Sequence, residues 1–209
     1  MDQPKVFIVH GFEGTPNGGW RPWLMGKLAL EDVYACALPM PTPYAPTKDG
    51  WVTEIARAVG NENVLIPASP DGGARERREL ENVFLVGHSL GVPAILQYLK
   101  SLPETAVIGG AVLVSGPYHN VDDGYRMLLE SFFDPAYDFA HAKKVCKNFV
   151  VIHGSDDTVV PFSDAEEFSK ALSCELISVE NGGHLNGSSG WRELPPALDA
   201  LIRFIKNKK

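Results

Sequence analysis

The chain has 209 residues, a length that suits one α/β domain with a sizeable core. Its composition, 44% hydrophobic and 22% charged, is that of an ordinary globular protein. The formal net charge of −7 argues against nucleic acid or an anionic membrane as the main partner.

The three cysteines, Cys36, Cys146 and Cys174, are far apart and lack the spacing of a metal site. No disulfide framework is needed, so a reducing compartment fits. The N-terminus carries only a short apolar run, and no stretch approaches the roughly 18 apolar residues of a membrane span. We therefore expect a cytoplasmic protein without metal or cofactor, with no nucleic-acid or membrane partner; a protein partner stays open.

Short β-rich runs alternate with amphipathic segments, which is typical of βαβ units around a parallel sheet. The runs contain much Val, Ile, Leu and Phe and little polar alternation, as in strands covered on both faces. We predict a three-layer α/β/α fold with a mostly parallel sheet of about six strands and little or no cap. The predicted strands are Val6–Val9, Val33–Leu38, Val83–Val86, Val107–Val114, Phe149–Ile152 and Glu175–Val179.

Helix-compatible apolar spacing follows most of these runs. Ser163 with Glu166 three residues later has the pattern of a capping box, so we expect Ser163 to cap a helix that ends near Leu172. The other predicted helices are Trp20–Leu30, Trp51–Val59, Leu90–Leu102 and Pro196–Lys206.

Two regions interrupt this rhythm. Pro39–Pro46 is dense in proline and predicts an extended loop. Gly60–Asn82 combines turn residues with a charged stretch that predicts a short exposed helix. Neither looks like a linker between domains, so we expect one domain over residues 1–209.

Gly87–Gly91 reads G-H-S-L-G, the pattern G-x-S-x-G, and lies between an apolar strand and a helical segment. Strand, sharp turn and helix in this order form the nucleophile elbow of hydrolases. The glycines are required because the turn brings backbone segments close together. The pattern predicts Ser89 as the nucleophile and the N–H of Leu90 as one donor of an oxyanion hole.

A serine nucleophile needs a general base, and the base needs an acid that orients it. In α/β-hydrolases the order along the chain is serine, acid, histidine. His184 follows a predicted strand, and Gly182 and Gly183 allow its loop to bend, so His184 is the candidate base. His153 comes too early in this order, and His119 and His141 lack a strand-end position.

His10–Gly14 follows the first predicted strand. A glycine there lets the backbone approach the reaction centre, so the N–H of Phe12 is the candidate second oxyanion donor. His10 is expected to be structural and to hold this loop by hydrogen bonds. A glycine-rich turn without a catalytic role is the alternative.

Taken together these residues resemble the α/β-hydrolase superfamily, and more narrowly the small serine hydrolases related to retinoblastoma-binding protein 9 and its bacterial relatives. The resemblance covers nearly the whole chain, including the segments FIVHGFEGTPNGGWRPWL, LPMPTPYAPTKDGW, FLVGHSLGVPAILQYL, VIHGSDDTVVP and GGHLNGSSGW. It implies a hydrolase with a Ser-Asp-His triad. The span between Trp51 and Ser89 is longer than the family pattern, and residues 61–81 are either a flap near the site or a surface excursion.

Two adjacent aspartates are candidates for the triad acid. In hydrolases of this kind the acid lies in the pattern HGxxDxxVP, which selects Asp157 when counted from His153. Neighbouring side chains point in different directions, so one aspartate alone can reach His184. We expect Asp156 to close the turn through backbone N–H groups.

The leading hypothesis is a serine hydrolase that transfers the acyl group of small carboxylic esters, resembling a carboxylesterase. Trp20, Tyr44 and Trp191 are candidates for the substrate pocket. Amide or thioester cleavage uses the same machinery and stays open. A protein-interaction module with a vestigial or secondary triad is the alternative from another class.

Overall fold

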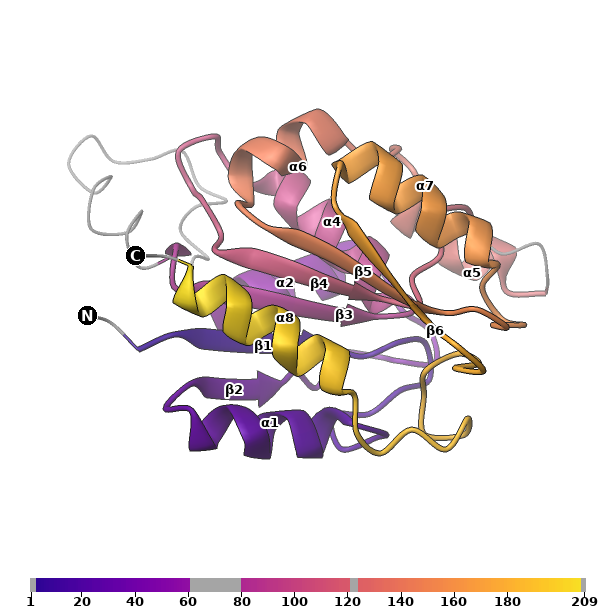
Figure 1. Cartoon of the computed structure of the whole chain (residues 1–209). Coiled ribbons are helices and arrows are strands. Elements are labelled where there is room, and N and C mark those ends of the chain that lie inside the picture. The colour runs from indigo at the N-terminus through magenta and orange to yellow at the C-terminus, as the bar shows by residue number, and fades with distance from the viewer. Residues whose placement is uncertain (1–2, 61–79, 121–123, 208–209) are drawn as a thin grey trace.

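The computed structural model describes residues 3–60, 80–120 and 124–207. Its strands form one parallel sheet in the order β2-β1-β3-β4-β5-β6, with helices on both faces (Figure 1). The strands are β1 (Lys5–Val9), β2 (Tyr34–Ala37), β3 (Val83–His88), β4 (Gly110–Val114), β5 (Phe149–Gly154) and β6 (Glu175–Val179). The predicted three-layer fold with a six-stranded parallel sheet is confirmed.

One face of the sheet is covered by α1 (Arg21–Leu30) and α8 (Pro195–Lys206). The opposite face carries α2 (Lys48–Val59), α4 (Gly91–Ser101), α6 (Phe139–Val145) and α7 (Phe162–Leu172). Two short helices, α5 (Arg126–Leu129) and η2 (Glu130–Phe132), lie in the connection between β4 and β5. Both α1 and α8 begin with proline in the first turn, where the missing N–H has no partner to lose.

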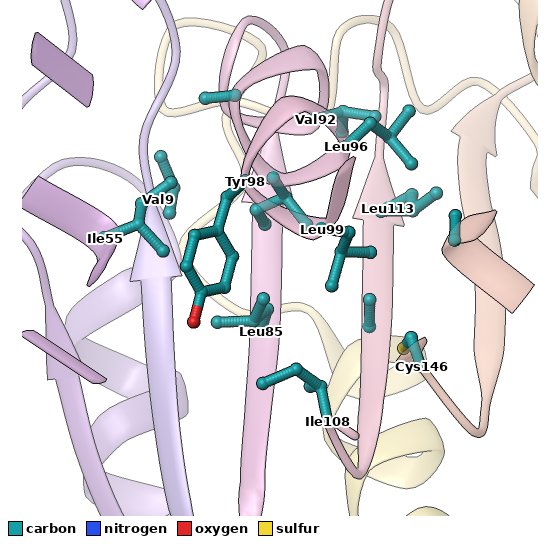
Figure 2. Close-up of a cluster of buried hydrophobic side chains, with 14 of the residues drawn as sticks. Val9, Ile55, Leu85, Val92, Leu96, Tyr98, Leu99, Ile108, Leu113 and Cys146 are labelled. Atoms are coloured by element: carbon teal, nitrogen blue, oxygen red, sulfur yellow. The ribbon is translucent and has the colours of Figure 1, made fainter. Parts of the chain in front are cut away.

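The larger core lies between the sheet and α4. Every residue of β3 and β4 is buried, which explains why these strands are almost wholly apolar. Tyr98 of α4 is fully buried against the sheet (Figure 2). Figure 2 also shows Val9 of β1 beside Ile55 of α2, and Leu85 of β3 and Leu113 of β4 near Leu99 of α4.

The strand order places a topological switch point between β1 and β3. The chain leaves β1 toward α1 on one face and leaves β3 toward α4 on the other. Loops that diverge in this way at the carboxyl ends of parallel strands leave room for a ligand between them. The loop after β1 and the elbow after β3 meet at this point.

The capping box predicted at Ser163 is wrong. Helix α7 begins at Phe162, directly after Pro161, and no side chain caps it. Pro161, with φ −58 and ψ 141, already sets the direction of the chain into the helix. Pro39–Pro46 forms neither helix nor strand, as predicted. The charged helix expected within Gly60–Asn82 falls mostly on residues 61–79, which lie outside the described residues.

Candidate active site

Ser89 stands on a strained turn between β3 and α4. Its backbone has a positive φ of +53°, a conformation that non-glycine residues rarely adopt. The backbone on either side of Ser89 packs so closely that only glycine fits there. A Cβ on Gly87 would lie 2.8 Å from the carbonyl oxygen of Gly91, and a Cβ on Gly91 would overlap the carbonyl oxygen of Val9. The segment therefore has the geometry of a nucleophile elbow.

Asp157 and His184 come together at the carboxyl ends of β5 and β6. The Nδ1 atom of His184 donates to Oδ2 of Asp157 at 2.8 Å. The Asp157 side chain is fully buried, whereas the His184 side chain keeps 8% of its surface exposed. Of the two adjacent aspartates, Asp157 is therefore the one that can orient the imidazole.

The other oxygen of Asp157 holds its own loop. Oδ1 accepts hydrogen bonds from the N–H groups of Val159 and Val160, at 2.8 and 3.0 Å. Burial raises the pKa of Asp157, but the hydrogen bond from His184 and the two backbone donors outweigh it, so the pKa lies below its usual value. The carboxylate is thereby kept charged and in one orientation.

Asp156 does not close the turn on which it lies, contrary to the prediction. Its Oδ1 accepts from the N–H of Gly183 at 2.8 Å, so it reaches across to the loop of His184. The turn itself is held by Asp157. Both aspartates thus bind the loop after β6 that carries His184, called the histidine loop below. Asp157 binds its imidazole, and Asp156 binds its backbone.

A cavity of about 380 Å³ brings Ser89 and His184 together. Both residues line it, with Gly11, Phe12 and His88 beside them. Among the described residues Ser89 Oγ has no hydrogen-bond partner, and such contacts are often longer in the absence of substrate. The serine and the imidazole therefore share one reaction space.

The loop after β1 places a second backbone segment against the serine. A Cβ on Gly11 would lie 2.8 Å from Cβ of Ser89, so only glycine permits this approach. Within the described residues, the N–H groups of Phe12 and Leu90 have no recorded acceptor. Both can therefore donate to an oxyanion formed on a substrate bound at Ser89. His10 is buried, and its Nδ1 donates to the carbonyl oxygen of Gly11 at 2.8 Å, the loop-fixing role expected of it.

Three ring N–H groups donate hydrogen bonds to backbone carbonyl oxygens of the histidine loop. His88 Nε2 donates to the carbonyl oxygen of His184 at 3.0 Å, and Trp20 Nε1 donates to that of Leu185 at 2.8 Å. Trp191 Nε1 donates to the carbonyl oxygen of Gly182 at 2.6 Å. Burial lowers the pKa of His88 to about 3, so this imidazole is neutral and acts as a fixed donor.

The three candidate pocket residues do not line this cavity. Trp20 is fully buried in the core beneath the sheet, where its indole N–H has the partner that burial demands. Trp191 packs on the same side and also supports the histidine loop. Tyr44 is 69% exposed on the proline-rich loop. The role of His88 was not predicted from the sequence, although His88 directly precedes the elbow serine.

The remaining buried histidine lies beneath the acid. His153 Nε2 donates to the carbonyl oxygen of Val160 at 3.0 Å and lies 3.4 Å from Oδ2 of Asp157.

In the part of the chain that the structure describes, no group of three or more His, Cys, Asp and Glu residues could hold a metal ion. Over the same residues, no helix is long and apolar enough to cross a membrane.

Comparison with known proteins defines the class. The profile of the family described as serine hydrolase matches residues 74–203, more than half of the chain, so the chain belongs to this family and is a hydrolase of the α/β superfamily. The family resemblance of the sequence is thereby confirmed.

Individual relatives agree with this membership. The chain is 29% identical over 204 residues to "Putative hydrolase YdeN" of Bacillus subtilis (strain 168), covering 98% of this chain and 97% of the relative. The crystal structure of the ydeN gene product from B. subtilis is 31% identical, with a TM-score of 0.83 over 98% of this chain and 100% of that one. Est1E from Butyrivibrio proteoclasticus, 16% identical, has a TM-score of 0.69 over 98% of this chain and 89% of its own, which shows a shared fold.

Proposed function

We propose that the chain, as one domain over residues 1–209, hydrolyses small carboxylic esters by acyl transfer to Ser89. The observation that carries the proposal is the 2.8 Å hydrogen bond from His184 Nδ1 to Asp157, with His184 and Ser89 lining one cavity. This bond leaves Nε2 of His184 as the nitrogen without a proton, ready to accept one.

The reaction divides into two transfers. Ser89 Oγ attacks the ester carbonyl carbon while its proton passes to Nε2 of His184, and the tetrahedral oxyanion receives hydrogen bonds from the N–H groups of Phe12 and Leu90. Collapse of this intermediate breaks the ester C–O bond, and the imidazolium returns the proton to the leaving alcohol. Water then attacks the acyl-enzyme by the same steps, which releases the acid and restores Ser89.

The size of the cavity supports small substrates. About 380 Å³ lies near the lower end of the range of ligand pockets. Its lining is rich in glycine and polar side chains and contains no large aliphatic residue. Long-chain lipids would find little apolar surface there, so short or polar acyl groups fit better.

A fluorophosphonate probe and a panel of 4-nitrophenyl esters of graded chain length test the proposal. We expect covalent labelling that is lost in Ser89→Ala, and turnover that falls as the acyl chain lengthens. A folded protein that is neither labelled nor active on any ester would overturn the proposal and favour the protein-interaction module. Activity on a matched thioester or anilide, exceeding that on the ester, would reassign the preferred bond.

A further inference from the structure

Arg21 is a buried cation that has no carboxylate partner among the described residues. It is the first residue of α1 and only 6% of its surface is exposed. Its Nε donates to the carbonyl oxygen of Thr15 at 3.0 Å. Among the described residues, no carboxylate oxygen lies within 4.0 Å of its guanidinium. Arginine is seldom buried to this extent without a charged partner, because desolvating the charge is costly.

Arg21 lines the cavity of Ser89 and His184. The terminal nitrogens of its guanidinium keep some contact with solvent, since neither is both fully buried and without a hydrogen-bond partner. Nη2 of Arg21 lies against Gly18, where a Cβ would displace the head group. The guanidinium carbon also lies 5.8 Å from the ring of Trp20. Packing therefore fixes the cation at the cavity wall.

The charge persists at neutral pH. Burial lowers the pKa of Arg21 to about 10, which leaves it protonated under ordinary conditions. Its field also helps, after burial, to hold down the pKa of the two nearby histidines, His10 and His88. Among the described residues, no carboxylate within 4.0 Å offsets this charge.

A second arginine lines the same cavity from the loop of His184. Arg192 reaches Gly187, where a Cβ would lie 3.0 Å from its Nη1. The lining contains one carboxylate, that of Glu13, which is exposed and forms no ion pair within 4.0 Å with either arginine among the described residues. The wall of the cavity therefore carries more positive than negative charge, although the whole chain is acidic.

We infer that the ester substrate carries a carboxylate, which the guanidinium of Arg21 binds inside the cavity with Arg192 at its rim. This inference rests on the proposed function and narrows its substrate class. A planar guanidinium matches a carboxylate in a two-point contact, and the buried charge gains the partner that the protein does not supply. The carboxylate belongs either to the acyl group or to the alcohol.

Two pairs of esters separate these possibilities. Mono-4-nitrophenyl adipate and its monoamide differ only in the charge at the far end of the acyl group. Likewise, 4-acetoxybenzoate and 4-acetoxybenzamide differ in the charge on the leaving alcohol. The quantity measured is the ratio of kcat/KM for the carboxylate to kcat/KM for the amide in each pair.

We expect this ratio to fall roughly tenfold to a hundredfold in Arg21→Gln for one of the two pairs. Arg21→Lys should retain part of it, and Arg192→Gln should lower it less. The matched control is Arg203→Gln, which removes an exposed arginine of α8 that pairs with Glu175 of β6. It should leave both ratios unchanged.

Binding of adipate itself keeps the inference testable if Arg21→Gln is poorly folded. Adipate should slow fluorophosphonate labelling of the wild-type protein, and much less that of Arg21→Lys. Ratios that are equal in the wild type and in the Arg21 variants, or adipate that protects neither protein, would overturn the inference. Failure of the proposed function is distinct, because it would show as no labelling and no turnover of the amide-bearing esters.

Discussion

The elbow after β3 and the histidine loop after β6 reach the same cavity by different means. The elbow is shaped by its own backbone: Ser89 has a positive φ, and the adjacent glycines leave no room for a side chain. The histidine loop is held by side chains from elsewhere, including Asp156 after β5 and Trp20 before α1. One half of the site is thus local in the sequence, and the other half is assembled by the fold.

The two halves of the site should therefore respond to different kinds of substitution. A steric site fails when an atom is added, because close-packed backbone has nowhere to move. A site held by hydrogen bonds fails when a donor or acceptor is removed, because the buried partner is left unsatisfied. Substitutions of each kind should therefore act differently on stability and on turnover.

The largest expected effect is on the histidine loop. Asp157→Asn should lower kcat by about 10³- to 10⁴-fold, since an amide can no longer favour the imidazole tautomer with its proton on Nδ1. Stopped assays with a 4-nitrophenyl ester measure it. The protein should stay folded, because the amide oxygen can still accept from Val159 and Val160. A loss below tenfold would contradict the role assigned to this carboxylate.

Adding one methyl group to the elbow should come next. Gly91→Ala places a Cβ onto the carbonyl oxygen of Val9 and 2.9 Å from that of His10, which should cost about 2–4 kcal/mol of unfolding free energy. Urea denaturation gives this value. Gly26→Ala in α1, with nothing within 4 Å of its Cβ, is the matched control and should stabilise by about 0.5–1 kcal/mol. Equal effects would argue against a steric origin.

An acid-dependent loss of stability should follow from His88. Its pKa is about 3 in the folded protein against an ordinary 6.5, so the unfolded chain takes up the proton first as the pH falls. Stability is therefore complete above pH 6.5 and declines toward pH 3, by about 2 kcal/mol between pH 7 and pH 5 at 1.36 kcal/mol per unit.

The variant His88→Asn should remove this part of the decline while still donating toward His184. Denaturation at both pH values compares it with the wild type, and His119→Asn, which changes an exposed histidine, serves as the control. An unchanged decline in His88→Asn would mean that the acid sensitivity arises at other groups.

The smallest effect is expected at Asp156. Asp156→Ala removes the acceptor for Gly183 N–H and should lower kcat/KM by about threefold to tenfold, corresponding to one lost hydrogen bond at an exposed position. Asp156→Asn keeps an oxygen in place and should stay within about twofold of the wild type. If the two variants behave alike, the hydrogen bond between Asp156 and Gly183 does not contribute to turnover.

The sequence predicted best what depends on neighbours along the chain. The buried strands and the elbow at Ser89 could be located because strand composition and close-packed glycines leave a local pattern. Asp157 was distinguished from Asp156 only with the help of a family pattern, and its contact with His184 spans 27 residues.

The support of the histidine loop could not be predicted in this way. Trp20 and Leu185 are 165 residues apart, and His88 and His184 are 96 apart. The aromatic residues predicted a substrate pocket. However, an indole buried in a core also needs an acceptor for its N–H, and here carbonyl oxygens of the histidine loop accept that hydrogen bond. Likewise, the unpaired charge of Arg21 becomes visible only when its burial is known.

The bonds from Trp20 and Trp191 to the histidine loop have an optical consequence. They use two of the four tryptophans of the chain as donors to that one loop. Indole emission shifts to the red when its surroundings become more polar and water is admitted. A change in the contact between these indoles and the loop should therefore change the intrinsic fluorescence of the unlabelled protein, and a single-tryptophan variant that retains Trp20 isolates the contribution of its bond to Leu185.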